Sequence, residues 1–161
     1  MELQENIINV SLLKKMSSVS NLLENIKNYN ETHLDNDCVV YNNGNIIDCE
    51  EIPITHAFAD QIYLRQMNMS KDQIVVGAVH NHKHIWFLMT GKVSIRTEDE
   101  IITHVAPCYT VSEPGEQRVI YAHEDSIFIN IHKNPTNNKN IQDLEKEIVS
   151  LTKKEYEQKN K

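Results

Sequence analysis

The sequence predicts an all-β fold, an antiparallel sandwich or barrel, with one helix before it and one after it. From about residue 36 to residue 133, apolar residues come in short or alternating runs, separated by the turn sequences NNGN, SKD, TGK, TEDE and EPGE. Neighbouring runs leave no room for a crossover helix, which argues against a parallel α/β sheet. Helical periodicity is confined to residues 10–26 and 141–151.

An amphipathic helix is expected in the first of three regions, which we place at residues 1–35, 36–133 and 134–161. Its apolar residues recur in steps of three and four and form one stripe: Val10, Leu13, Met16, Val19, Leu22, Leu23 and Ile26. The polar sequence NYNETHLDND follows as a linker. The stripe must pack either on the chain's own barrel or on another chain.

Ten short strands are expected in the middle region. They are Val39–Tyr41, Ile46–Cys49, Gln61–Met69, Ile74–His84, Ile85–Leu88, Lys92–Thr97, Ile101–Val105, Tyr109–Ser112, Val119–Tyr121 and Ser126–His132. Many short strands joined by tight turns are typical of antiparallel sandwiches and barrels.

The third region contains the loop KNPTNNKN and a second amphipathic helix. Ile141, Leu144, Ile148 and Leu151 have the spacing of a short heptad seam. Two heptads are too few for a free-standing coiled coil, so this helix also needs a surface to pack on. The two helices together favour a homo-oligomer or a larger assembly.

The composition excludes several classes of protein. The 161 residues carry a formal net charge of -7 with a pI near 5.6, which argues against a binder of nucleic acid or anionic membranes. No stretch approaches the ~20 apolar residues of a membrane span, and the start MELQENIINV lacks the features of a signal peptide. Three cysteines without a CxxC pair fit a reducing compartment. We therefore expect the protein in the cytoplasm.

The clearest candidate site lies in the sequence GAVHNHKHIWFLMTG. His80, His82 and His84 occupy alternate positions, so in a continuous strand they would share one face. They would then hold a metal, line a wet pocket, or be the remains of such a site. Three histidines in line on a straight strand cannot all reach one ion, so at most two could act together with a ligand from another strand.

The strand order and two motifs resemble the cupin superfamily of double-stranded β-helix (jelly-roll) barrels. In that family the first motif carries two histidines, a glutamate and a glycine. Aligning Gly91 with the motif glycine puts His84 at the glutamate position, His80 at the second histidine and Ala78 at the first. The resemblance implies a jelly roll with a divalent metal site at the barrel mouth.

The second cupin motif is a proline-glycine turn followed three residues later by a histidine. Here VSEPGEQRVIY supplies Pro114 and Gly115, but Arg118 stands at the histidine position. An arginine cannot coordinate a cation and would repel one. The chain therefore keeps the framework of the family and loses at least two of its four ligands.

Three states of the site remain open. The first is an intact mononuclear metal site. The second is a rearranged site for zinc, nickel, iron or manganese, built from His80, His82 and His84, with His123 or His132 as a further ligand. The third has no metal, with Arg118 and the histidines hydrogen-bonded inside the pocket or binding an anion or a partner's carboxylate.

A narrower resemblance covers roughly residues 60–150. The sequences HNHKHIWFLMTGKVSIRTEDE, APCYTVSEPGEQRVIYAHEDS and IHKNPTNNKNIQDLEKEI are similar to small cupin-like proteins encoded by tailed bacteriophages. This implies a protein made in the cytoplasm of an infected host. It favours a non-catalytic virion component of the tail or neck that contacts copies of itself or other virion proteins.

The main alternative is a small metal-dependent enzyme of the sugar isomerase or dioxygenase type. It would use His80, His82 and His84 as ligands and Glu116 or Glu124 as a base. Glu124 lies in the sequence AHEDS, where a β-turn stabilised by Asp125 and Ser126 is the favoured interpretation. A small-molecule sensor is a weaker third possibility, because no DNA-binding element accompanies the barrel.

Overall fold

The computed structural model describes residues 38–42, 45–48, 52–97 and 100–161. All of them belong to one compact unit, residues 35–161. The predicted N-terminal helix and its linker lie outside the described residues. In the described part, no helix is both long and apolar enough to span a lipid bilayer.

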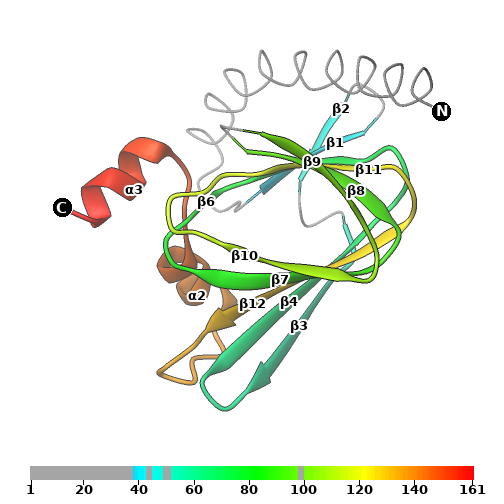
Figure 1. The fold of residues 1–161 in the computed structure, drawn as a ribbon. Coiled ribbons are helices and arrows are strands. Elements are labelled where there is room, and N and C mark those ends of the chain that lie inside the picture. The colour runs from blue at the N-terminus through cyan, green and yellow to red at the C-terminus, as the bar shows by residue number, and fades with distance from the viewer. Residues whose placement is uncertain (1–37, 43–44, 49–51, 98–99) are drawn as a thin grey trace. The chain divides into compact units, whose positions relative to one another are not determined.

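The described residues form two large antiparallel sheets and a small two-stranded one (Figure 1). In spatial order, the six-stranded sheet contains β2 (Asn45–Asp48), β1 (Cys38–Asn42), β5 (Ile74–Gly77), β11 (Val119–Ala122), β8 (Lys92–Arg96) and β9 (Ile101–Val105). The five-stranded sheet contains β10 (Cys108–Ser112), β7 (His84–Thr90), β12 (Ser126–Lys133), β4 (Ile62–Met69) and β3 (Ile54–Ala59). The prediction of an all-β jelly roll followed by helical structure is confirmed.

The apolar core lies between the two sheets. Trp86 and Phe128 of the five-stranded sheet stack with ring centroids 4.8 Å apart, and they belong to one cluster with Val93 and Ile120 of the other sheet. Burial alternates along β12, because successive side chains of a strand point to opposite faces. This alternation places Phe128 on the same inner face as the polar residues that follow it.

One strand, β3, is missing from the prediction. It forms a hairpin with β4, and its sequence ITHAFA has only two side chains, Ile54 and Phe58, that are even half-buried. The turn depends on Gln61, which has a positive φ of 59° and is not a typical turn residue. An edge strand with so few buried residues leaves a weak alternating pattern.

The predicted strand Ile74–His84 is wrong as a single element. It divides into β5, the short β6 (Val79–His80) and the start of β7, which belongs to the other sheet. The break arises because the chain binds the proline-glycine turn here: Gly77 N donates to Arg118 O (2.9 Å), and Gly115 N donates to His80 O (2.8 Å). The three histidines therefore do not lie on one straight strand.

The C-terminal segment differs from the predicted continuous helix. Helix α2 (Ile141–Ile148) begins at Asn140, whose side chain accepts a hydrogen bond from Asp143 N. The chain then forms β13 (Val149–Ser150), which pairs with β6, and a second helix, α3 (Lys153–Lys159). The predicted seam thus ends at Ile148, because the backbone of the next two residues is used in a sheet.

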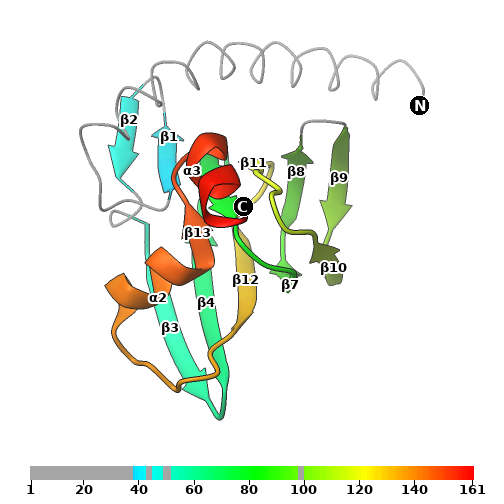
Figure 2. The ribbon, with the colours of Figure 1, turned by 90° about the vertical axis from the view of Figure 1, so that its left-hand side faces the viewer.

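Helix α2 covers one end of the barrel beside β3 and β4 (Figure 2). Leu144 and Ile148 are buried and pack with Tyr63 of β4. The surface on which this helix packs is therefore the chain's own barrel.

Candidate functional site

Three histidines from three different strands meet at the end of the barrel. The ligand atoms of His80, His84 and His132 all lie within 4.8 Å of one another. All three side chains are buried, with exposed fractions of 8%, 5% and 4%. The β7–β12 register pairs Ile85 with Ile131. In an antiparallel pair the next two residues, His84 and His132, then lie opposite each other, and both face inward.

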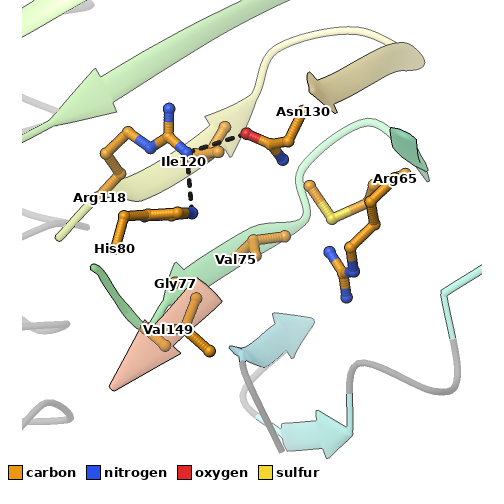
Figure 3. Close-up of a pocket in the computed structure, with 10 residues that line it drawn as sticks. Arg65, Val75, Gly77, His80, Arg118, Ile120, Asn130 and Val149 are labelled. Atoms are coloured by element: carbon orange, nitrogen blue, oxygen red, sulfur yellow. Dashed lines mark hydrogen bonds between the residues drawn. The ribbon is translucent and has the colours of Figure 1, made fainter. Parts of the chain in front are cut away.

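An arginine occupies the centre of this group. The Nη2 atom of Arg118 lies 3.0 Å from Asn130 Oδ1, 3.2 Å from His84 Nε2 and 3.4 Å from His80 Nε2. Figure 3 shows the guanidinium of Arg118 directed toward His80 and Asn130. Its other side faces the aromatic core, with Cζ 5.7 Å from the centroid of Phe128.

The hydrogen bonds define the protonation of the histidines. Arginine only donates, so His80 and His84 accept from Arg118 through unprotonated Nε2 atoms. The Nδ1 atom of His84 lies 3.4 Å from the carbonyl oxygen of His82, which can only accept, so the contact with Arg118 and this contact both fit a proton on Nδ1. The Nε2 atom also lies 3.3 Å from Asn130 Oδ1, a contact that would be a hydrogen bond only in the other tautomer. The two hydrogens of Arg118 Nη2 are thus shared among three acceptors, and the Asn130 contact is the shortest.

The charges at the site are unbalanced. Burial, then the nearby Arg118 and the other two histidines, lower the pKa of His80 well below 6.5. Burial first, then His84 and Arg118, also lower the pKa of His132 well below that value, and the pKa of His84 falls to about 4 through burial and Arg118. Burial lowers the pKa of Arg118 to about 10, which leaves it charged at neutral pH.

One carboxylate approaches this charge. Glu116 Oε1 lies 3.8 Å from Arg118 Nε and accepts a hydrogen bond from Ser112 Oγ at 2.6 Å. At 3.8 Å the contact is an ion pair and not a hydrogen bond. The Nε and Nη1 atoms of Arg118 and the Nδ1 atoms of His80 and His132 are buried and have no hydrogen-bond partner among the described residues.

A cavity of about 40 Å³ adjoins the group (Figure 3). Its lining includes Arg65, His80, Arg118 and Asn130, and Val149 of β13. One water needs at least about 10–15 Å³ of this kind of volume, whereas ligand pockets measure roughly 300–1,000 Å³. The cavity thus has room for a few water molecules and not for a sugar.

The three histidines could together hold a metal ion, as the cupin resemblance implies, but Arg118 stands in the way. A ligand nitrogen lies about 2.1 Å from zinc, whereas these nitrogens surround Arg118 Nη2 at hydrogen-bonding distances. A divalent ion about 4 Å from the guanidinium would be repelled by on the order of 8 kcal/mol at an effective dielectric of 20. That is at least about half of the ~10–16 kcal/mol that a structural zinc ion contributes. As arranged, the residues do not fit a metal.

The other predicted residues lie elsewhere. His82 lies in the bend between β6 and β7 and is half-buried, outside the histidine group. His123 Nε2 lies 2.7 Å from Ser94 Oγ, at the turn before β12. In the same segment Ser126 Oγ donates to Glu124 O, a local contact of the kind expected, whereas Asp125 Oδ1 accepts from Lys71 N, which is distant in the sequence.

Two residues of the site were not predicted. Asn130 precedes His132 by two positions in a strand that was predicted, so the alternation places both on one face. The sequence therefore contained the information needed to predict Asn130 as a site residue. Arg65 faces inward from β4, but an arginine in a strand is usually exposed, and nothing in the sequence marks it.

No protein-family model and no curated protein matches the sequence. Among solved structures, the chain is similar to a cupin superfamily protein from Desulfitobacterium hafniense (TM-score 0.47, 12% identity, 51% of this chain and 76% of that chain). It is also similar to an uncharacterized protein with a double-stranded β-helix domain from Klebsiella pneumoniae (0.47, 14%, 61% and 84%).

A third similar structure is an acetylacetone dioxygenase from Acinetobacter johnsonii (TM-score 0.43, 14% identity, 51% of this chain and 59% of that chain). Likeness at these levels carries no information about activity. Cupin superfamily proteins are among the solved structures to which this chain is similar.

Proposed function

We propose that this protein is a non-catalytic cupin-like module in which Arg118 takes the place of the metal ion, and that it serves as a virion component of a tailed phage. One observation carries the first part. Arg118 Nη2 lies within 3.0–3.4 Å of Asn130, His84 and His80, so a fixed positive charge already fills the donor group.

The size of the site supports a structural role. Catalysis needs a substrate beside the reacting groups, and the cavity of about 40 Å³ holds little more than water. The imidazoles of His80 and His84 and the amide oxygen of Asn130 act instead with the guanidinium of Arg118 as an internal polar cross-link between β6, β7, β12 and the residue before β11.

Metal binding provides the test. In wild-type protein we expect zinc, nickel, iron(II) and manganese to leave the melting temperature unchanged, because Arg118 repels them. The variant Arg118→His restores the histidine of the second cupin motif and removes the charge. At saturating zinc we expect it to gain about 3 kcal/mol of stability, or several degrees in melting temperature.

Arg118→Met is the matched control, because it removes the charge without adding a ligand. Zinc should stabilise it less than Arg118→His. Stoichiometric metal in the wild-type protein, lost in His84→Ala, would contradict the proposal and favour the metal-dependent enzyme, with Glu116 as its candidate base. Failure of Arg118→His to bind any metal would show that Arg118 does not stand at a cation position.

The virion role is supported by the resemblance of residues 60–150 to tailed-phage proteins. In purified particles of the phage that encodes this chain, mass spectrometry should find it in a fixed ratio to other virion proteins. Its absence from the particles, with abundant protein in the infected-cell lysate, would contradict this part and leave the metal result unaffected.

A further inference from the structure

The positive charge of Arg118 is only partly balanced inside the barrel. Its side chain is buried, and the three imidazoles near it stay neutral at pH 7, because burial lowers their pKa values. The carboxylate of Glu116 lies 3.8 Å from Arg118 Nε, but that side chain is 25% exposed and its Oε1 atom accepts a hydrogen bond from Ser112 Oγ. A buried charge is stable only when it is paired and hydrogen-bonded, so a second negative group beside Arg118 would stabilise the folded chain.

Arg118 also has hydrogen-bond donors to spare. A guanidinium carries five N–H groups, and the two on Nη2 face Asn130, His84 and His80. The other three N–H groups are on Nε and Nη1, and both of these atoms are buried without a hydrogen-bond partner among the described residues. Native proteins rarely leave buried donors unpaired, so such atoms mark places where a water or an ion binds.

These donors belong to a side chain that lines the cavity of about 40 Å³. Arg65 lines the same cavity, and Figure 3 shows Arg118 and Arg65 on opposite sides of the group of lining residues. The pairing of β12 with β4 places Arg65 opposite Asn130, so both residues point inward. No acidic residue is among the described residues of the lining. The described wall of the cavity thus offers positive charge and N–H donors to a ligand, and no negative charge.

The size of the cavity limits which ligand can bind. One water needs at least about 10–15 Å³ of such volume, so a cavity of about 40 Å³ admits a ligand of about three or four non-hydrogen atoms. Chloride, formate and nitrate lie within this limit. Sulfate exceeds it, and the burial of its two charges would also cost more than the burial of one.

We propose that this cavity binds a small monovalent anion, of the class of chloride, formate and nitrate, through the N–H groups of Arg118. This inference rests on the proposed function, in which Arg118 and not a metal ion occupies the donor group. The bound anion neutralises the guanidinium and accepts from its remaining donors. Val75, Ile120 and Val149 supply apolar walls, and the low dielectric beside them strengthens the attraction between the two charges.

Formate is a suitable probe, because its C–H proton allows binding to be measured by saturation-transfer NMR. The experiment uses the full-length protein after treatment with a chelator that removes metal ions. We expect a saturable formate signal that chloride reduces by competition and that sulfate at the same ionic strength leaves unchanged. A signal that does not saturate, or that sulfate reduces as strongly as chloride does, would overturn the proposal, because either result indicates non-specific binding to surface charges.

Two substitutions test whether the anion binds at Arg118. Arg118→Met removes the charge and the donors, and it should weaken formate binding at least about tenfold. Lys83→Met is its control, because it removes one positive charge from a side chain that is 62% exposed and lies outside the described lining. This variant should bind formate as the wild type does. Equal affinities of the wild type and Arg118→Met would overturn the proposal.

Val149→Phe keeps the test valid if Arg118→Met fails to fold. Val149 is half-buried, and the larger side chain fills the cavity from its edge while Arg118 stays in place. Formate binding should be lost. Leu151→Phe is the matched control, because Leu151 is also half-buried but is not among the described lining residues, and it should retain binding. Formate binding that survives Val149→Phe would overturn the proposal.

The result for the anion can be separated from the result for the proposed function. Formate binding that disappears on chelation and returns with zinc would indicate a metal at the site and would contradict both proposals. Absence of formate binding in folded, metal-free wild-type protein would overturn only the anion site, and Arg118 would remain the internal cross-link.

Discussion

Replacing Gly91 by alanine is expected to prevent stable folding. Gly91 joins β7 to β8 with a positive φ of 84°, a conformation that costs an L-residue with a side chain about 1 kcal/mol or more. A Cβ atom there would overlap Ser126 Oγ and lie 2.5 Å from Asp125 O and 2.9 Å from Ser126 Cα. Because two of these atoms are backbone, β12 itself would have to shift. We expect a loss of several kcal/mol, which is most of the stability of a domain this size.

Gly115→Ala is the control for Gly91→Ala. Gly115 has nearly the same φ, 83°, but the added Cβ would meet only the ring of Tyr156, at 3.0 Å and beyond. A half-buried side chain on α3 can move aside, so this variant should fold and lose only about 1–2 kcal/mol. Urea unfolding followed by circular dichroism compares the two. Equal losses would show that φ alone, and not the clash with β12, sets the cost.

Loss of stability in mild acid is the second large effect that we expect. A histidine whose folded pKa lies below its unfolded value of about 6.5 binds fewer protons when folded. Such a histidine therefore makes its full contribution to stability above about pH 6.5, its unfolded pKa, and loses it as the pH falls toward the folded pKa. For His84, with a pKa of about 4, the window runs from about pH 6.5 to pH 4.

His80 and His132 act in the same direction. His80 faces Arg118 and the other two histidines, and His132 faces these groups together with His82 and Arg65. Glu116 is the carboxylate that approaches this group, through Arg118. The three protons that this group takes up only on unfolding give a slope of up to about 4 kcal/mol per pH unit. His82 and His104, whose pKa values burial also lowers, add to this slope.

The measurement is the free energy of unfolding in urea between pH 7 and pH 5, above the range in which most carboxylates titrate. In His132→Gln we expect the slope to fall by up to about 1.4 kcal/mol per pH unit, the share of one proton, whatever the stability of the variant at pH 7. A flat profile in the wild-type protein would contradict the protonation assigned to the site. So would an unchanged slope in the variant.

The fold was predictable because the alternating pattern is local. A strand such as Ser126–His132 buries every second side chain, and the short turns between strands allow only antiparallel pairing of neighbours. The edge strand β3 was missed because few of its side chains are buried. The end of α2 was misplaced because the pairing of β13 with β6 is a long-range contact that no local pattern signals.

The site was predictable only in part. The spacing of His80, His82 and His84 suggested one face of one strand, but backbone contacts with the distant proline-glycine turn break that strand. His84 and His132 come together through the register of β7 and β12, which sequence alone does not fix. The inward direction of Arg118 was suggested by its position in the second cupin motif and not by its chemistry, since a buried arginine is rare.

The pairing of β13 with β6 has a consequence for how the protein is made. Val149 pairs with His80, Asn81 N donates to Ile148 O, and Ser150 Oγ donates to Asn81 Oδ1, so one wall of the histidine group comes from residues that follow the last barrel strand in the chain. This wall therefore leaves the ribosome after every strand of the two large sheets. Until it pairs with β6, the imidazoles and the guanidinium keep access to water on that side.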